Sequence, residues 1–248
     1  QLNENDLNNY LNSLDNDNYS EYYRVYIPRV ELYWDYSHNQ SVFSQLNGVM
    51  TYDSTYAPSF IEMKEIAPQV KDFKSEWIFT IEDEDLLNFT NVKYAIVTDK
   101  SQLPEGDYTL IDDAYMYSLL VYENNDYRKL GITYDSILKY STLNKDGSDV
   151  AKLLNNIVAL DKDYDEISQL IGSSIDTLEN IEYGNNHLYG TVESKDDNFM
   201  VITLPYDKGW NISVNGEEVK TYSVNGGMIG FSISEGYNEV YMNFIPEG

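Results

Sequence analysis

The chain has 248 residues, and its 42 acidic against 16 basic residues give a net charge of −26. So strong a negative charge repels nucleic acid and anionic lipid head groups, which argues against binding to DNA, RNA or a membrane surface through a basic patch. The sequence holds no cysteine, which excludes a disulfide framework, a thiolate zinc site and a cysteine nucleophile.

The composition is that of a folded segment of a longer protein. Hydrophobic residues make up 42% of the sequence, and 24 tyrosines supply aromatic area that disordered chains lack. The length suffices for one large domain or two ordinary ones. No apolar run approaches the roughly 20 residues of a membrane-spanning helix, and no signal peptide is visible after Gln1. We therefore expect both ends to be cut sites in a polypeptide that could carry hydrophobic segments on either side.

The first predicted elements alternate between helix and strand. Leucines near the start recur at helical spacing and predict a short amphipathic helix. The tyrosine-rich run 22–27 predicts a strand. The stretch 39–56 is rich in Ser, Asn, Gly and Tyr and predicts a loop. A helix follows, which we expect to begin at Pro58 and to stop before Pro68.

The middle of the chain predicts a short helix and several strands. Acidic residues at the start of 82–89 suit the first turn of a helix. The run 92–97 predicts a buried strand. Segments 108–111 and 116–122 predict a strand pair joined through Asp112 and Asp113. The second of them is apolar on both faces, so we expect it to be central in its sheet.

The clearest helical pattern covers residues 149–160. Its apolar residues follow helical spacing, and Ser148 is the expected N-cap. The acidic run after it begins like an EF-hand loop with Asp161, Asp163 and Asp165. Glu166 stands where that loop needs glycine, and Gly172 stands where it needs glutamate. We therefore interpret the run as a solvated acidic linker and expect no metal site.

From Thr177 the pattern changes to short alternating strands. They are separated by turn residues, and Asn215-Gly216 is a strong hairpin signal. Strands at this spacing indicate an antiparallel sandwich. The expected strands are 188–192, 199–204, 210–214, 229–233 and 240–244. The predicted fold is α+β, with a mixed α/β subdomain at 1–172 and an antiparallel, jelly-roll-like β-sandwich at 173–248.

No pattern in the chain predicts a catalytic centre. Neither a glycine-rich nucleotide loop nor a serine-nucleophile elbow occurs, so we expect no cofactor in this segment. With 42 acids, some pair will satisfy the spacing of a glycosidase, which makes carboxylate pairs uninformative.

Aromatic side chains are the candidates for binding. Tryptophans can stack on the apolar faces of sugars or pack in a core. Trp210 precedes an alternating strand and is expected to be a core residue, whereas packing and binding stay equally open for Trp34. The irregular stretch 34–56 offers stacking faces together with amide, hydroxyl and other polar groups. The candidate ligand-binding residues are Trp34, Asp35, His38, Asn39, Tyr52 and Ser54.

An ordered series of short motifs resembles a known family. The series Tyr206-Asp207-Lys208-Gly209-Trp210, Asn215-Gly216 and Val224-Asn225-Gly226 resembles the C-terminal signature of the YfhO-type bacterial membrane proteins. Gly236-Tyr237-Asn238 continues it. Weaker pieces in the first half are Tyr23-Arg24-Val25, Val92-Lys93-Tyr94 and Val121-Tyr122-Glu123-Asn124. The signature residues are Tyr206, Gly209, Trp210, Asn215, Gly216, Asn225 and Gly226.

The resemblance implies an accessory role at the bacterial cell envelope. The family consists of multi-pass proteins similar to GT-C glycosyltransferases, which implies transfer of sugars from a lipid-phosphate donor to surface polymers such as lipoteichoic acid. The catalytic acid of such enzymes lies in a loop between membrane helices, so no catalytic residue carries over to this chain. The implied partners are the transmembrane part of the same polypeptide and a cell-surface glycopolymer, on the extracytoplasmic face of a Gram-positive membrane.

Two other interpretations stay open from the sequence. The chain could be a self-standing carbohydrate-binding or adhesin-like surface module, or a hydrolase with an unrecognised pair of acids. The charge of −26 also argues against tight direct binding of a polyphosphate such as lipoteichoic acid, unless alanylation or divalent cations offset it.

Overall fold

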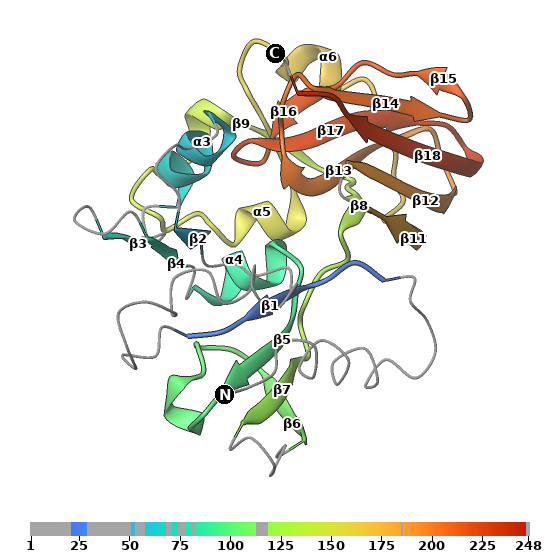
Figure 1. Ribbon diagram of the computed structural model, residues 1–248. Helices are drawn as coiled ribbons and strands as arrows, with labels where there is room; N and C mark the ends of the chain where they lie inside the picture. The colour runs from blue at the N-terminus through green and yellow to red at the C-terminus, as the bar shows by residue number, and fades with distance from the viewer. Residues whose placement is uncertain are drawn as a thin grey trace. The chain divides into compact units, whose positions relative to one another are not determined.

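The computed structural model describes residues 21–28, 51–52, 58–67, 71–73, 78–80, 83–112, 119–184 and 186–246 (Figure 1). The chain divides into two compact units. The first is formed by residues between 23 and 55 and between 69 and 128, together with the N-terminal segment. The second is formed by 129–248 with the short segments 20–22 and 56–68. Among the described residues, no helix has both the length and the apolar character needed to cross a membrane.

The first unit is built on a four-stranded sheet. The strand order is β1 (Arg24–Tyr26), β5 (Val92–Val97), β7 (Leu120–Asn124) and β6 (Tyr108–Asp112). Strand β1 runs parallel to β5, and the other neighbours are antiparallel. All six residues of β5 are buried, and β7 is an inner strand, so both expectations for these segments are confirmed.

Short elements complete the first unit. Helix α4 (Glu84–Phe89) begins at Asp83, whose side chain accepts the backbone N–H of Leu86 at 3.1 Å, and this confirms the short acidic helix expected at 82–89. A 3₁₀ turn, η1 (Lys100–Gln102), follows β5. A separate three-stranded sheet has the order β2 (Thr51–Tyr52), β4 (Ile78–Thr80) and β3 (Lys71–Phe73).

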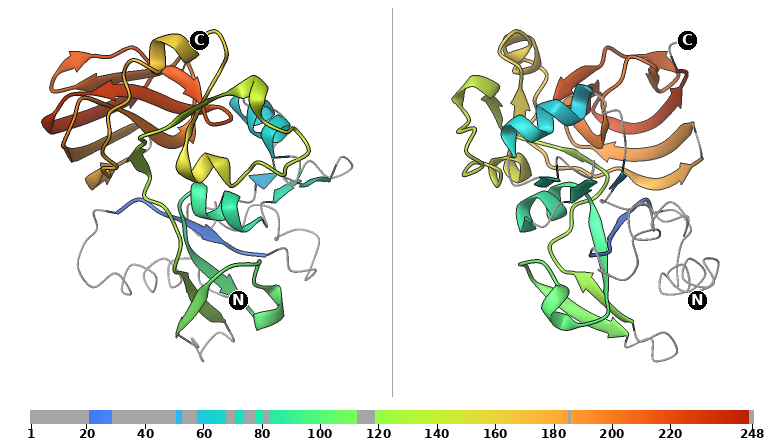
Figure 2. Two further views of the ribbon diagram at one scale, coloured as in Figure 1. Left: turned by 180° about the vertical axis from the view of Figure 1, so that it is seen from behind. Right: turned by 60° about the vertical axis from the view of Figure 1, so that its left-hand side comes forward.

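The second unit contains two larger sheets, most of whose strands are the orange and red arrows of Figure 2. The six-stranded sheet has the order β8 (Gly131–Thr133), β13 (Asn198–Pro205), β17 (Met228–Ile233), β16 (Tyr222–Val224), β10 (Ile157–Ala159) and β9 (Ile137–Lys139). The five-stranded sheet has the order β11 (Glu179–Tyr183), β12 (His187–Ser194), β18 (Gly236–Phe244), β14 (Trp210–Val214) and β15 (Glu217–Glu218).

The two sheets pack face to face. Met200 and Phe231 of the six-stranded sheet share one buried cluster with Leu188, Val240 and Met242 of the five-stranded sheet. These residues alternate with outward-facing ones along each strand, as in a sandwich. The predominantly β architecture is therefore consistent with the expected β-sandwich. Its jelly-roll-like connection, and the mixed α/β unit expected for residues 1–172, stay predictions.

The six-stranded sheet is covered on its second face as well. Phe199 and Val201 point away from the sandwich core and pack with Ile157 and with Ile167 of helix α6 (Tyr164–Ile167). A Cβ on Gly230 would lie 2.4 Å from the ring of Phe199, so glycine is required there for the ring to fit. Strands β8, β9 and β10 belong to this sheet, so the second unit begins at Lys129, before the predicted boundary near residue 172.

The expected helix at 149–160 is wrong over its second half. Helix α5 is a single turn at Lys152–Asn155, preceded by Ala151 instead of Ser148 at the N-cap position. Residues Ile157–Ala159 form strand β10, which pairs in parallel with β9. β-Branched residues such as Ile157 favour strands, and here all three residues of β10 are buried on the sheet. An apolar run of this length fits either structure, and tertiary packing decides between them.

The expected Asn-Gly hairpin turn and the helix expected from Pro58 are confirmed, whereas the short helix expected near the start of the chain lies outside the described residues. Helix α3 spans Pro58–Ile66. Asn215 and Gly216 have φ of 54° and 81° and connect β14 to β15, as the hairpin signal predicts. A 3₁₀ turn, η2 (Tyr140–Thr142), follows β9.

Candidate functional site

The outer side of the five-stranded sheet carries the most prominent group of exposed aromatic and polar side chains in the described part of the chain. Tyr237 is 58% exposed and Tyr241 is 47% exposed, although both lie in a strand whose alternate residues are buried. We call this surface the tyrosine face. Its members are the outward residues of β11, β12, β14, β15 and β18, namely Glu182, His187, Tyr189, Glu193, Asn211, Ser213, Glu218, Tyr237, Glu239, Tyr241 and Asn243.

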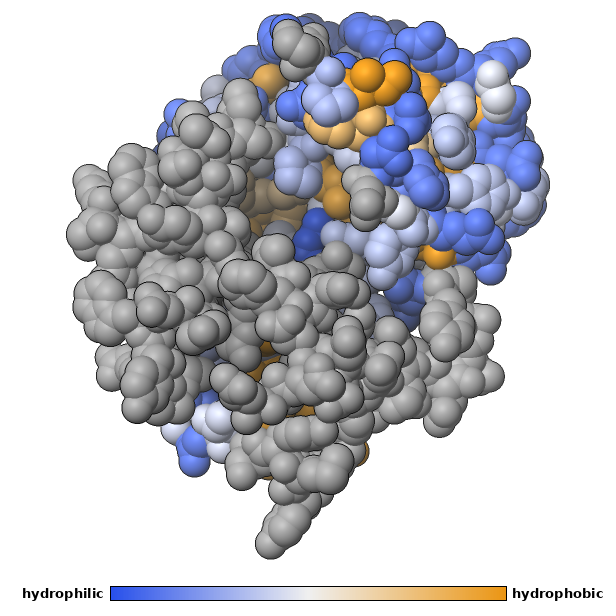
Figure 3. Space-filling model, in the orientation of Figure 1, coloured by the Kyte–Doolittle hydropathy of each residue, from blue (hydrophilic) through white to orange (hydrophobic). Residues whose placement is uncertain are grey.

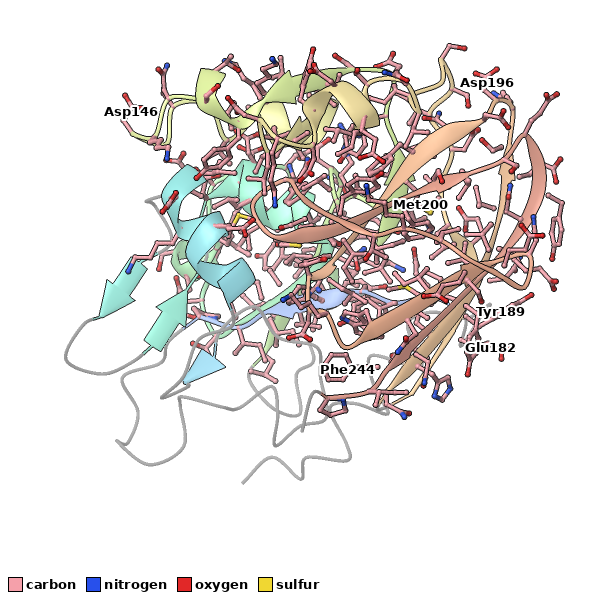
Figure 4. All side chains as sticks on the ribbon, turned by 90° about the horizontal axis from the view of Figure 1, so that it is seen from above. Asp146, Glu182, Tyr189, Asp196, Met200 and Phe244 are labelled. Carbon is pink, nitrogen blue, oxygen red and sulfur yellow. The ribbon has the colours of Figure 1, made fainter. Side chains whose placement is uncertain are left out.

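Strand register arranges these residues in rows across the sheet. The central row runs from Glu182 through Tyr189, Tyr241 and Ser213 to Glu218, because each is the direct pairing partner of the next. Side chains opposite one another in neighbouring strands lie close enough to touch. Figure 4 labels Tyr189 and Glu182 near each other on the outside of the sheet and Met200 in the interior of the sandwich.

The rows on either side add amides and acids. On one side His187 pairs with Asn243, which in turn pairs with Asn211. On the other side Thr191 pairs with Glu239, and Glu193 pairs with Tyr237. The face therefore alternates aromatic rings with hydrogen-bonding groups.

One polar contact fixes the orientation of a central ring. The hydroxyl of Tyr189 donates to Oε1 of Glu239 at 2.9 Å. This hydrogen bond is the largest of the effects that raise the pKa of Tyr189 to about 12, since ionising the phenol would place two negative charges side by side. The ring stays a neutral donor at physiological pH.

The five strands of the sheet contain neither lysine nor arginine. Their acidic residues are Glu179, Glu182, Glu193, Glu217, Glu218 and Glu239. Among the described residues, Glu179 alone of these six has an ion pair, with Lys129 at 4.0 Å. The visible surface of the second unit in Figure 3 is mostly blue, the colour of hydrophilic residues. The face can therefore bind neutral or cationic groups but opposes phosphates and carboxylates.

Exposed rings beside amides and carboxylates suit the recognition of sugars. A ring can cover the apolar face of a sugar, while neighbouring oxygen and nitrogen atoms bind its hydroxyls. No group of three or more metal-ligating side chains occurs among the described residues. Nor do the motifs of the sequence predict a nucleophile.

Most of the sequence-predicted ligand residues fall outside the part of the chain that the structure describes. Trp34, Asp35, His38, Asn39 and Ser54 lie outside the described residues, and for Tyr52 only its place in strand β2 is described. Their proposed role in ligand binding stays a prediction. Sequence reasoning missed the tyrosine face, although a signal was present in the alternation Tyr237, Glu239, Tyr241 around buried residues.

Trp210 lies at the margin of the sandwich core. It is half-buried, packs against the core cluster, and its ring centroid is 5.0 Å from that of Phe244. The turn before it is tight, because a Cβ on Gly209 would lie 2.5 Å from the carbonyl oxygen of Ile245. Asp207 closes this turn by accepting the backbone N–H of Gly209 at 2.7 Å. This part of the motif series thus joins β14 to the end of β18.

The Asn225-Gly226 motif is a second structural joint. Oδ1 of Asn225 accepts the backbone N–H of Val158 at 2.8 Å, and Nδ2 donates to the carbonyl of Asn156 at 2.9 Å. Gly226 has φ of +75°, and a Cβ on it would lie 3.1 Å from the Cα of Met63 in helix α3. The motif residues thus hold β10 and α3 against the turn between β16 and β17.

The described acidic residues around α4 in the first unit have structural surroundings of their own. Burial and then the neighbouring Asp85, Asp126 and Glu105 raise the pKa of Glu84. Asp83 is occupied as the N-cap of the helix. Residues 83–85 therefore start helix α4.

Comparison with known proteins supports the family resemblance. Residues 154–248 match the family model described as bacterial membrane protein YfhO. Over these residues the chain is similar to the YfhO type. The matched part includes both structural joints and the whole tyrosine face, whereas the motifs quoted from the first half lie outside it.

One curated relative shows the same similarity. An uncharacterized protein, YfhO of Bacillus subtilis (strain 168), is 22% identical over 94 residues, which make up 38% of this chain and 11% of that protein. The YfhO-type segment thus corresponds to a small part of its relative. No solved structure matches the chain.

Proposed function

We propose that this chain is an extracytoplasmic accessory segment of a membrane glycosyltransferase-like protein that modifies cell-surface polymers such as lipoteichoic acid. The segment itself is not catalytic. It binds a glycan on the tyrosine face and presents it to a transferase site in the transmembrane part of the same polypeptide, which would use a lipid-linked sugar donor. The observation that carries the proposal is the row of Glu182, half-buried Tyr189 and exposed Tyr241 on the outer side of a sheet that matches a membrane-protein family.

The arrangement favours an accessory role over a hydrolase. Hydrolysis of a glycoside needs two carboxyl groups facing each other across a cleft. The acids of the tyrosine face all project from one side of a single sheet, none pairs directly with another, and Glu239 accepts a hydrogen bond from Tyr189. A self-standing carbohydrate-binding module would use the same face, but the similarity to a membrane-protein family favours the first interpretation.

Complementation in cells tests the proposal. A strain lacking the full-length gene receives either the parent gene or a gene encoding Tyr189→Ala with Tyr241→Ala, and the sugar content of the surface polymer is measured. We expect the parent gene to restore modification and the double variant to lose it at normal surface abundance. The matched control is Tyr189→Phe with Tyr241→Phe, which keeps both rings and should retain most of the modification.

A second pair of substitutions separates the two candidate surfaces. Trp34→Ala with Asn39→Ala changes the stretch 34–56 and leaves the tyrosine face unchanged. Loss of modification in this variant alone would place the glycan at the stretch 34–56. If the parent gene does not alter the polymer at all, the glycosylation role is wrong.

A further inference from the structure

We infer that the Tyr189–Glu239 pair binds the ammonium group of an amino-bearing sugar, so that the tyrosine face prefers glycans with free amino groups. The inference deepens the proposed function and rests on it. It comes from comparing this pair with two other tyrosine–glutamate pairs in the second unit.

The first comparison pair holds a lysine of the chain itself. The hydroxyl of Tyr140 donates to Oε2 of Glu65 at 2.6 Å. Lys145 lies over this pair, with its Nζ 4.7 Å from the centroid of the Tyr140 ring and 3.3 Å from the same Oε2 of Glu65. The ammonium thus meets the ring face and the carboxylate together, and each contact favours a positive charge.

The second comparison pair is arranged in the same way. Lys220 lies with Nζ 4.7 Å from the centroid of the Tyr222 ring and 2.7 Å from a carboxylate oxygen of Glu166. The proximity of Glu166 contributes to a raised pKa of Tyr222, and that of Tyr222 to a lowered pKa of Glu166, after the larger effects of burial and of Lys220 respectively. The fold therefore uses a tyrosine and a glutamate twice to bind an organic ammonium group.

The Tyr189–Glu239 pair has the same chemistry without a lysine. Its hydroxyl-to-carboxylate hydrogen bond is 2.9 Å long. Among the described residues, neither a lysine nor an arginine lies over the Tyr189 ring or forms an ion pair with Glu239, and none occurs in the five strands. Glu182 and Tyr241 flank Tyr189 on either side. An ammonium group on a ligand would thus meet the ring of Tyr189 and the carboxylate of Glu182 in the central row. The carboxylate of Glu239 lies in the neighbouring row.

The residues around the Tyr189–Glu239 pair favour a sugar over a simple cation as the ligand. Tyr241 and Tyr237 are exposed tyrosines on which further sugar units can stack, and Ser213 continues the row. The acids repel phosphate and uronate groups, so the face disfavours the anionic parts of a surface polymer. Neutral sugars keep the stacking contacts but lack the charge-assisted bond to Glu239.

Binding by the isolated chain tests this inference. The probes are a short glucosamine oligomer, its N-acetylated counterpart and an oligogalacturonate, titrated at low ionic strength by calorimetry. We expect the free-amine oligomer to bind most tightly, the acetylated oligomer more weakly and the uronate not at all. Binding of the free amine should weaken as salt is added, because exposed charges are screened.

Substitutions assign the preference to the pair. Glu239→Gln keeps a hydrogen-bond acceptor for Tyr189 and removes the charge, so it should weaken free-amine binding by up to about fivefold and leave the acetylated oligomer unchanged. Tyr189→Ala should weaken both oligomers. The matched control is Glu65→Gln, which changes the equivalent pair already occupied by Lys145 and should leave both affinities unchanged.

The outcomes distinguish the preference for amino sugars from the proposed glycan binding. Equal affinity for the acetylated and free-amine oligomers would overturn the amino preference and leave the proposed glycan binding in place. Failure of every oligosaccharide to bind would overturn both. Equal binding of an oligolysine that Tyr189→Ala does not weaken would show attraction by charge alone, and would also overturn the inference.

Discussion

At the scale of single residues, Asn225 illustrates how one buried amide joins separate segments. Its side chain accepts a hydrogen bond from the backbone of Val158 and donates one to that of Asn156, and the residue is fully buried with φ of 49°. Asparagine tolerates this left-handed backbone better than most residues, since its short polar side chain can bond locally. The Asn225-Gly226 motif thus places asparagine where both its side-chain hydrogen bonds and its tolerance of a left-handed backbone are needed.

Replacing Asn225 by alanine should therefore destabilise the second unit. The substitution leaves buried backbone groups without partners, which costs about 1–3 kcal/mol, and places alanine in a left-handed conformation at a cost of about 1–2 kcal/mol. Urea unfolding should show a loss of about 2–5 kcal/mol. The control is Asn155→Ala at an exposed position in α5, expected within about 0.5 kcal/mol of the parent. Equal stability of the two variants would contradict this role of Asn225.

Trp210 is a second residue whose role can be measured. Because it is half-buried at the margin of the core, truncation to alanine should cost less than the roughly 3–5 kcal/mol typical of a fully buried large aromatic, and we expect about 2–3 kcal/mol. Thermal or urea unfolding of Trp210→Ala measures this. A variant as stable as the parent would show that the ring contributes nothing to the core, and would return it to the candidate sugar-stacking residues.

At the scale of elements, two glycines separate two kinds of constraint. Gly216 has φ of +81°, and a Cβ added to it would meet no atom within 4 Å, whereas Gly230 has ordinary φ but would place a Cβ 2.4 Å from the Phe199 ring. At Gly216 the backbone conformation disfavours other residues, whereas at Gly230 the space for a side chain is missing. The Asn-Gly pair marks Gly216 as a turn residue in the sequence, whereas no sequence pattern marks the close approach at Gly230.

Alanine substitutions at the two glycines should differ in cost. Gly216→Ala should cost about 1 kcal/mol through backbone strain alone. Gly230→Ala should cost more, up to about 3 kcal/mol, because the fully buried Phe199 has little room to move. A double variant Gly230→Ala with Phe199→Leu should lose less stability than the two single losses added together. Additive losses would show that the ring is not what restricts Gly230.

Much of the second unit could be predicted from the sequence, and the exceptions have physical causes. Alternation and turn residues located β12, β13, β14, β17 and β18 because each strand has one face in the sandwich core. Strand β10 was missed because its run is apolar throughout and pairs with distant segments. The tyrosine face was missed because it forms only when register aligns strands far apart in the sequence.

At the scale of the whole molecule, the net charge of −26 opposes folding through self-repulsion. Raising the ionic strength from about 0.01 M to about 0.15 M shortens the screening length from about 30 Å to about 8 Å. We expect the thermal midpoint to rise by a few degrees over this range. Sodium and magnesium chloride at equal ionic strength should act alike, and a much larger effect of magnesium would contradict the expected absence of a metal site.

The central claim is that the tyrosine face lies outside the cell on a membrane protein, and cysteine labelling tests it most directly. The segment has no cysteine, so Ser213→Cys in the full-length protein adds one thiol within the central row of the face. The buried control is Met200→Cys, and the unsubstituted protein gives the background. A membrane-impermeant maleimide should label Ser213→Cys in intact cells and leave Met200→Cys unlabelled. Labelling of Ser213→Cys only after the cells are lysed would contradict the claim.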